Sequence, residues 1–128
     1  MSIFVDAGKR FELRITCNVI KNTDGEVLCY KMDPNGKCEI CCDVKGRNFA
    51  DMSSIIEDAT IINSVTGNPL LRTSVLCKNI ITSFFSVIKI KDGDNEETFY
   101  PDPHNVGLMR YELVKALSKK WLEMTGGK

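Results

Sequence analysis

The fold is decided by residues 11–44, which read FELRITCNVIKNTDGEVLCYKMDPNGKCEICCDV. Two turn signals, Asn-Thr-Asp-Gly at 22–25 and Asp-Pro-Asn-Gly at 33–36, separate three runs in which apolar and polar residues alternate. Side chains on a β-strand point alternately to its two faces, so this alternation is typical of strands with one buried face. The sequence therefore predicts a three-stranded antiparallel meander that supplies one wall of the core.

The two turns set the predicted registers. Asp-Gly at 24–25 favours a two-residue type I′ turn, which places Val19 opposite Tyr30 and Cys17 opposite Met32. Asp-Pro-Asn-Gly favours a type I turn with a bulge, which places Tyr30 opposite Ile40. The face expected to be buried then carries Phe11, Leu13, Ile15, Cys17, Val19, Leu28, Tyr30, Met32, Cys38, Ile40, Cys42 and Val44. The other face carries Glu12, Arg14, Thr16, Asn18, Val27, Cys29, Lys31, Lys37, Glu39, Cys41 and Asp43.

Residues 51–83 are expected to form helices. The first, Asp51–Ser64, has apolar residues at helical spacing and Asp51 as its cap, although β-branched residues leave a strand as the alternative for 58–65. Pro69 is expected at the first position of a second helix, which reaches about Ser83. That helix is apolar on most sides, which indicates either the central helix of the domain or one partly covered by another chain.

The last third of the sequence predicts a β-hairpin followed by a long helix. Residues 84–100 form the hairpin, with its turn at 92–95, and residues 105–124 form the C-terminal helix. With residues 1–44 as the meander, including a short leading strand at 2–6, the chain is expected to be a single α+β domain spanning 1–128. We expect a sheet of roughly three to five antiparallel strands, packed on one face by two or three helices.

Composition excludes several classes of function. Seventeen basic residues balance seventeen acidic ones, so attraction to nucleic acid or to an anionic membrane is not indicated. No apolar run approaches the roughly 20 residues of a membrane span. The first six residues are too short and acquire charge too early for a signal peptide, so a cytoplasmic location is expected.

The six cysteines are expected to be reduced thiols, because a chain of 128 residues can bury a core without disulfides or metal. Cys38 and Cys41 have the C-x2-C spacing of zinc sites, but no second pair exists and the two would point to opposite faces of a strand. The predicted register instead places Cys29 directly opposite Cys41. These two are weak candidates for a metal site or a redox pair, and no cofactor is expected apart from this zinc alternative.

The sequence lacks a catalytic pattern, which favours a non-catalytic protein. The single histidine, His104, has no nucleophile that can be tied to it, and no phosphate-binding or nucleophile-elbow motif occurs. Lys119 and Lys120, next to Trp121, resemble a basic surface for nucleic acid, but Glu123 lies among them. Nucleic-acid binding is therefore not favoured.

The C-terminal helix offers a candidate interface. Leu108, Tyr111 and Leu122 fall opposite its main apolar stripe, around Lys115, and grouped exposed apolar residues are typical of interfaces. The sequence therefore favours a non-catalytic protein-interaction or assembly module, a small subunit of a larger complex or a homo-oligomer. Its partner would be another protein or itself. The alternatives are a small-ligand- or zinc-binding domain that uses the meander cysteines, and a viral or phage structural or assembly protein.

Overall fold

The structure is a computed structural model that describes residues 9–126, so the predicted leading strand at 2–6 lies outside the described residues. The strands are β1 (Arg10–Lys21), β2 (Val27–Met32), β3 (Cys38–Lys45), β4 (Thr60–Ile62), β5 (Pro69–Leu71), β6 (Phe85–Asp92) and β7 (Asn95–Phe99). The helices are α1 (Phe49–Ala59), α2 (Thr73–Phe84), α3 (Pro103–Leu108) and α4 (Tyr111–Met124).

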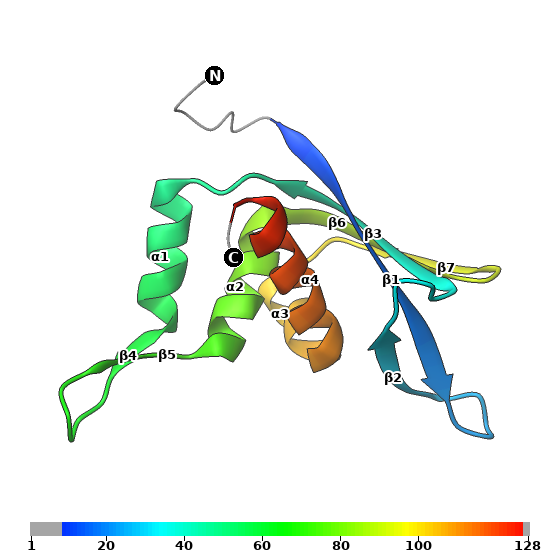
Figure 1. Cartoon of the computed structure of the whole chain (residues 1–128), viewed down its shortest axis with the longest axis horizontal. Coiled ribbons are helices and arrows are strands. Elements are labelled where there is room, and N and C mark those ends of the chain that lie inside the picture. Colours follow the sequence, from blue (N-terminus) through cyan, green and yellow to red (C-terminus); the bar gives the residue numbers. More distant parts are fainter. Residues whose placement is uncertain (1–8, 127–128) are drawn as a thin grey trace.

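The main sheet is antiparallel and has five strands in the order β2-β1-β3-β6-β7. It arches over the helices, with α2, α3 and α4 on its concave side and α1 beyond α2 (Figure 1). The predicted α+β class is confirmed. A separate two-stranded hairpin, β4–β5, projects at the end of the molecule away from β2 (Figure 1).

The β1–β2 register matches the prediction, with Cys17 opposite Met32 and Val19 opposite Tyr30. The type of turn differs from the prediction. Gly25 has φ 83°, but no non-glycine residue of the described chain has positive φ. A type I′ turn needs positive φ at Asp24 as well. The turn instead uses Gly25 alone in the left-handed region, and an irregularity between Ile20 and Lys21 restores the expected register.

The predicted pairing of the second and third runs is wrong, because β3 pairs with β1 and not with β2. Cys17 lies opposite Cys38, and Ile15 opposite Ile40. Strand β1 has 12 residues and β2 only 6, so β2 covers only the second half of β1 and leaves the first half to β3. In the order β2-β1-β3, the segment 33–37 must therefore pass across β1.

Polar contacts hold this crossing on the outer face of β1. The Thr16 hydroxyl donates to the Asp33 carbonyl over 2.6 Å, and the Asn18 amide donates to the Asp33 carboxylate over 2.9 Å. Gly36 lies directly on the backbone of Cys17, with no space for a side chain. The crossing is thus a close backbone approach that only glycine permits.

The predicted division of the sheet into two faces is confirmed on β3 and along β1 from Leu13, whereas Phe11, which was expected in the core, is 38% exposed. Leu13, Cys17 and Ile40 are buried, whereas Glu12 and Arg14 are exposed. Leu28 and Met32, which were expected in the core, are exposed on β2. Strand β2 is the edge of the sheet, and its side chains receive less cover from the helices.

Trp121 anchors α4 beneath the sheet. Its indole nitrogen donates to the Lys45 carbonyl over 2.9 Å, and its ring stacks on Phe84 with centroids 4.4 Å apart. The guanidinium carbon of Arg47 lies 5.6 Å from the Trp121 ring centroid, and Arg47 also donates to the Leu122 carbonyl. Fully buried Trp121 therefore ties the end of β3, helix α2 and helix α4 together.

The region 48–72 departs from the two predicted helices. Asn48, not Asp51, caps α1 by accepting from the Asp51 amide over 2.9 Å. The strand alternative is correct for residues 60–62, which form β4. Pro69 opens β5 rather than a helix, and α2 starts at Thr73. Helix α2 lies centrally among the helices, which agrees with the first of the two alternatives for this apolar segment. It buries Cys77, Ile80, Ile81 and Phe84.

The predicted 84–100 hairpin is present as β6–β7, with Gly93 at φ 63° in its turn. The prediction of a single C-terminal helix is wrong, because the segment forms two helices, α3 and α4. Asp102 and Asn105 cap α3 reciprocally, and Met109 and Arg110 are extended. Residue 108 therefore does not belong to the same helix as residue 122.

The crossing gives a direct test of the fold. Replacing Gly36 with alanine would drive a methyl group into the Cys17 backbone, so we expect the free energy of unfolding to fall by about 1–3 kcal/mol or more. Gly107→Ala, in α3 with open space around it, is the matched control and should be neutral or slightly stabilising. Urea unfolding followed by Trp121 fluorescence measures both. Equal stability of the two variants would contradict the crossing.

Candidate functional site

The residues predicted as an interface are only partly brought together. Leu108 is 75% exposed on α3, and Tyr111 and Lys115 are exposed on α4. Leu122 is half-buried and packs against the core. The exposed pair Leu108 and Tyr111, called the helix surface below, is what remains of the predicted patch.

The junction that carries the helix surface is fixed to the edge of the sheet. Arg110 donates to the carbonyl oxygens of Leu28 and Val27, and the Glu112 carboxylate accepts from the Tyr30 amide over 3.1 Å. Among residues 9–126, no strand lies beside these β2 groups, since β2 is the last strand on that side of the sheet. Two charged side chains therefore occupy hydrogen-bonding positions that would otherwise attract another strand.

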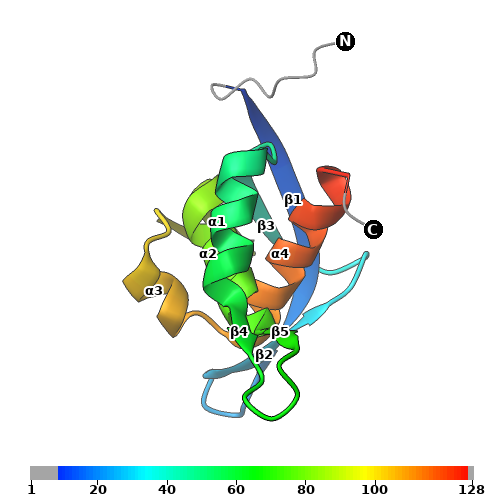
Figure 2. The same ribbon diagram turned by 90° about the vertical axis from the view of Figure 1, so that its left-hand side faces the viewer.

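A larger apolar surface lies on the β4–β5 hairpin. Val65 is 91% and Ile62 65% exposed, and three further aliphatic side chains of the hairpin are also exposed. The complete set, called the hairpin surface below, is Ile61, Ile62, Val65, Leu70 and Leu71. The hairpin projects from the body of the molecule in Figure 1, and in the end-on view of Figure 2 it lies below α1 and in front of β2.

The hairpin surface has a defined backbone. The Asn63 side-chain oxygen accepts from the Val65 and Thr66 amides, and the Gly67 amide donates to the Asn63 carbonyl. At the base, the Arg72 amide donates to the Ala59 carbonyl over 2.7 Å. The exposed aliphatic groups are thus presented on an ordered hairpin between α1 and α2.

The sequence analysis missed this surface because it assigned residues 60–71 to helices. A signal was present: Thr60–Leu71 contains no charged residue, although charged residues make up 27% of the chain. An uncharged stretch with paired aliphatic residues on either side of Asn63 and Gly67 is also typical of a hairpin.

The concave side of the sheet contains a cleft that the helices leave open. Two adjoining cavities of about 370 and 360 Å³ share Tyr30 of β2, Ile90 of β6 and Glu97 of β7. Burial raises the pKa of Tyr30, with nearby Cys38 and Glu97 adding to the effect. The edge cleft, as we call it, lies between the two outer strands of the sheet. Beside its apolar side chains it is lined by the carboxylates of Asp92, Glu96 and Glu97 and by the cations Lys21 and Arg110.

The structure overturns the predicted Cys29–Cys41 contact. Cys29 lies opposite Ile20, and Cys41 lies between Arg14 and Lys89 on its two neighbouring strands. The cause is the strand order, because β1 separates the strands that carry these two cysteines. The pair brought together is buried Cys17 and Cys38. Within residues 9–126 no three His, Cys, Asp or Glu side chains are grouped as metal ligands.

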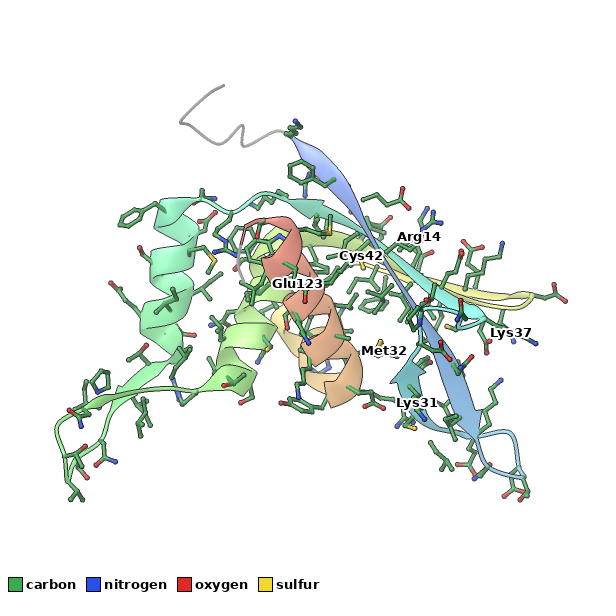
Figure 3. All side chains as sticks on the ribbon, in the orientation of Figure 1. Arg14, Lys31, Met32, Lys37, Cys42 and Glu123 are labelled. Atoms are coloured by element: carbon green, nitrogen blue, oxygen red, sulfur yellow. The ribbon has the colours of Figure 1, made fainter. Side chains whose placement is uncertain are left out.

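The candidate nucleic-acid residues lie in a groove of mixed charge. Lys119 and Lys120 line it with Arg14, but Asp33 and Glu123 line it too. Arg14 comes from β1 and Glu123 from α4, on different elements of the molecule (Figure 3). The lone His104 is exposed at the start of α3. The groove offers phosphate no surface of a single charge.

Comparison with known proteins gives no relatives: no family model, no curated protein and no solved structure matches the chain. Across the described part of the chain, none of the helices combines the length and the apolar character that crossing a bilayer requires. The class that the fold defines is an α+β protein with an arched antiparallel sheet.

The buried thiols predict an alkaline limit to stability. Burial raises the pKa of Cys17 and of Cys42 to about 12 from the ordinary 9.0, and the neighbouring Cys38 adds to the effect on Cys17. The folded chain therefore keeps protons that the unfolded chain loses. The free energy of unfolding should be fully retained below pH 9 and fall as pH rises towards 12.

Urea unfolding at a series of pH values tests this expectation. The Cys17→Ala/Cys42→Ala variant should be less stable at neutral pH but lose less stability above pH 9 than the parent protein. A parent protein with constant stability across this range, or a variant with an unchanged pH profile, would contradict the assignment.

Proposed function

We propose that this chain is a non-catalytic assembly module that binds another protein, or a second copy of itself, as a small subunit of a complex. The single observation that supports the proposal is the hairpin surface. Its five large aliphatic side chains are exposed together on an ordered element that reaches out from the body. Single exposed apolar residues are ordinary, but apolar groups gathered in this way are typical of binding sites.

The free energy of burying apolar surface also supports an assembly function. Each Å² of apolar surface removed from water contributes about 25 cal/mol, so covering exposed Ile62 and Val65 would stabilise a complex considerably. An isolated two-stranded hairpin is marginally stable in water and gains from packing against another element. In the part of the chain that the structure describes, β4 and β5 pair only with each other. A partner that covers the hairpin would supply the missing contact.

The helix surface is a second contact of the same kind. Leu108 and Tyr111 are exposed side chains on a junction held by Arg110 and Glu112. A rigid surface loses little conformational entropy on binding, which favours association. Leu122 is not part of this contact, since it packs against the core.

Native mass spectrometry of untreated protein tests the proposal. We expect a species heavier than one chain, either an oligomer or a complex with a co-purified protein, and we expect Leu71→Glu on the hairpin surface to abolish it. The matched control is Leu28→Glu, because Leu28 is 55% exposed and Leu71 51%, and both leucines lie on edge strands. Single chains throughout, or equal loss with both substitutions, would contradict the proposal.

The edge cleft supports a second candidate, a site for a small ligand. Three carboxylates, Asp92, Glu96 and Glu97, outnumber the two cations Lys21 and Arg110 in its lining. With Tyr30 and the apolar Ile90 and Phe99 beside them, this favours a small organic cation with an apolar body. The same native spectrum would show the ligand as added mass on the folded chain, and Glu97→Gln should remove that mass. An unmodified chain mass in the untreated sample would leave this candidate without support.

A further inference from the structure

We infer that the partner of the hairpin surface is a second copy of this chain, and that the two copies join antiparallel through the outer edges of their β4 strands. The inference rests on the proposed function and specifies its partner. It follows from the hydrogen bonds that the hairpin leaves open, from the charge of the hairpin and from its side chains.

The free backbone groups lie on β4. The Asn63 amide donates to Asn68 and the Arg72 amide to Ala59, so the hydrogen-bonded pairs of the hairpin fall on every second residue. In an antiparallel pair the intervening residues direct their N–H and C=O groups outward. Ile62 is such a residue, and its N–H and C=O groups point to the outer edge of β4.

The other edge of the hairpin is less suitable. Pro69 lies opposite Ile62, so it faces outward on β5 and has no N–H to donate. On β4, the Thr60 amide is already used, since it donates to the Glu57 carbonyl at the end of α1. By the same alternation Leu71, opposite Thr60, directs its N–H outward on β5, but it lies next to the charged Arg72. Ile62 combines an open N–H with uncharged neighbours, so β4 is the edge at which an identical strand can add.

The absence of charge favours an identical partner. A twofold contact places the same surface on both sides, so any charge near the axis faces its own copy and repels it. Residues 60–71 carry no charged side chain. The nearest charged residues are engaged within the chain, because Arg72 donates to the Asp58 carbonyl and Asn79 donates to the Asp58 carboxylate. The hairpin can meet its copy without like charges in opposition.

The side chains also suit a four-stranded sheet made by two hairpins. Ile62 and Leu71 lie on one face of the hairpin, and Ile61 and Leu70 on the other. All four are exposed in the single chain. Pairing β4 with β4 would set aliphatic side chains of the two copies side by side on both faces, and such cross-strand pairs stabilise sheets. The hairpin projects from the body of the molecule in Figure 1.

Sedimentation velocity of the purified chain over a range of concentrations tests the inference. We expect a reversible monomer–dimer equilibrium. Ile62→Pro removes the open N–H without removing a bond inside the hairpin, and Ile62→Lys places like charges near the axis. Each should weaken the dimer by about tenfold or more, or roughly 1.4 kcal/mol. Leu28→Glu, on the exposed edge strand β2 and outside both surfaces, is the control and should leave the dimer unchanged.

A second measurement covers the case in which a variant fails to fold, which circular dichroism would reveal. In the unaltered protein, the Ile62 amide should exchange its hydrogen slowly at concentrations where the dimer forms and rapidly where it does not. A chain that stays monomeric, or a dimer that neither Ile62 substitution weakens, would overturn the inference. If the chain is monomeric but a different co-purified protein is lost with Leu71→Glu, the assembly function stands and only the second copy is excluded.

Discussion

The contact on which the rest of the structure depends is the approach of Gly36 to the backbone of Cys17. One twelve-residue strand, β1, serves both β2 and β3, and the chain can reach the second of these positions only by crossing β1. The crossing is short and lies on the outer face, between Thr16 and Asn18, which bind Asp33 from either side. Because the connection stays outside, the concave face remains free for α2 and α4. The order β2-β1-β3 follows from this constraint, and so does the separation of Cys29 from Cys41.

The same arrangement explains where the molecule is closed to other chains and where it is open. Strand β2 is an edge, but Arg110 and Glu112 occupy its outward backbone groups. Strand β4 is also an edge, and residues 60–71 of its hairpin carry no charged side chain. Proteins commonly protect exposed strand edges with charges, so an uncovered edge among exposed aliphatic groups is the place where association is favoured. The proposals for assembly and for self-pairing both rest on this contrast between the two edges.

Between these features, Trp121 holds the helical layer in position. Its hydrogen bond to Lys45 and its stacking on Phe84 connect α4 to the end of β3 and to α2, while Arg47 lies against the ring from the side of β3. Helix α4 begins at the junction that covers β2, so the anchor at Trp121 also positions Arg110 and Glu112. The stability of the core and the protection of the sheet edge are thus coupled through one helix. The β4–β5 hairpin, attached between α1 and α2, lies outside this coupling.

Features set by neighbours in the chain could be predicted from the sequence. Alternation identified the buried faces of β1 and β3, such as Leu13 and Ile40, and the β1–β2 register and the later hairpin followed from short turns. Helical spacing also identified Leu108 and Tyr111 as exposed, although it misplaced Leu122. What only the tertiary structure decided was the strand beside β3, the change from helix to strand at Ile61, and the hairpin surface as a candidate site. The physical reason is that β1 and β2 present the same alternation to β3, and β-branched residues such as Ile61 suit helix or strand according to their neighbours. Contacts between residues far apart in the chain therefore made these choices.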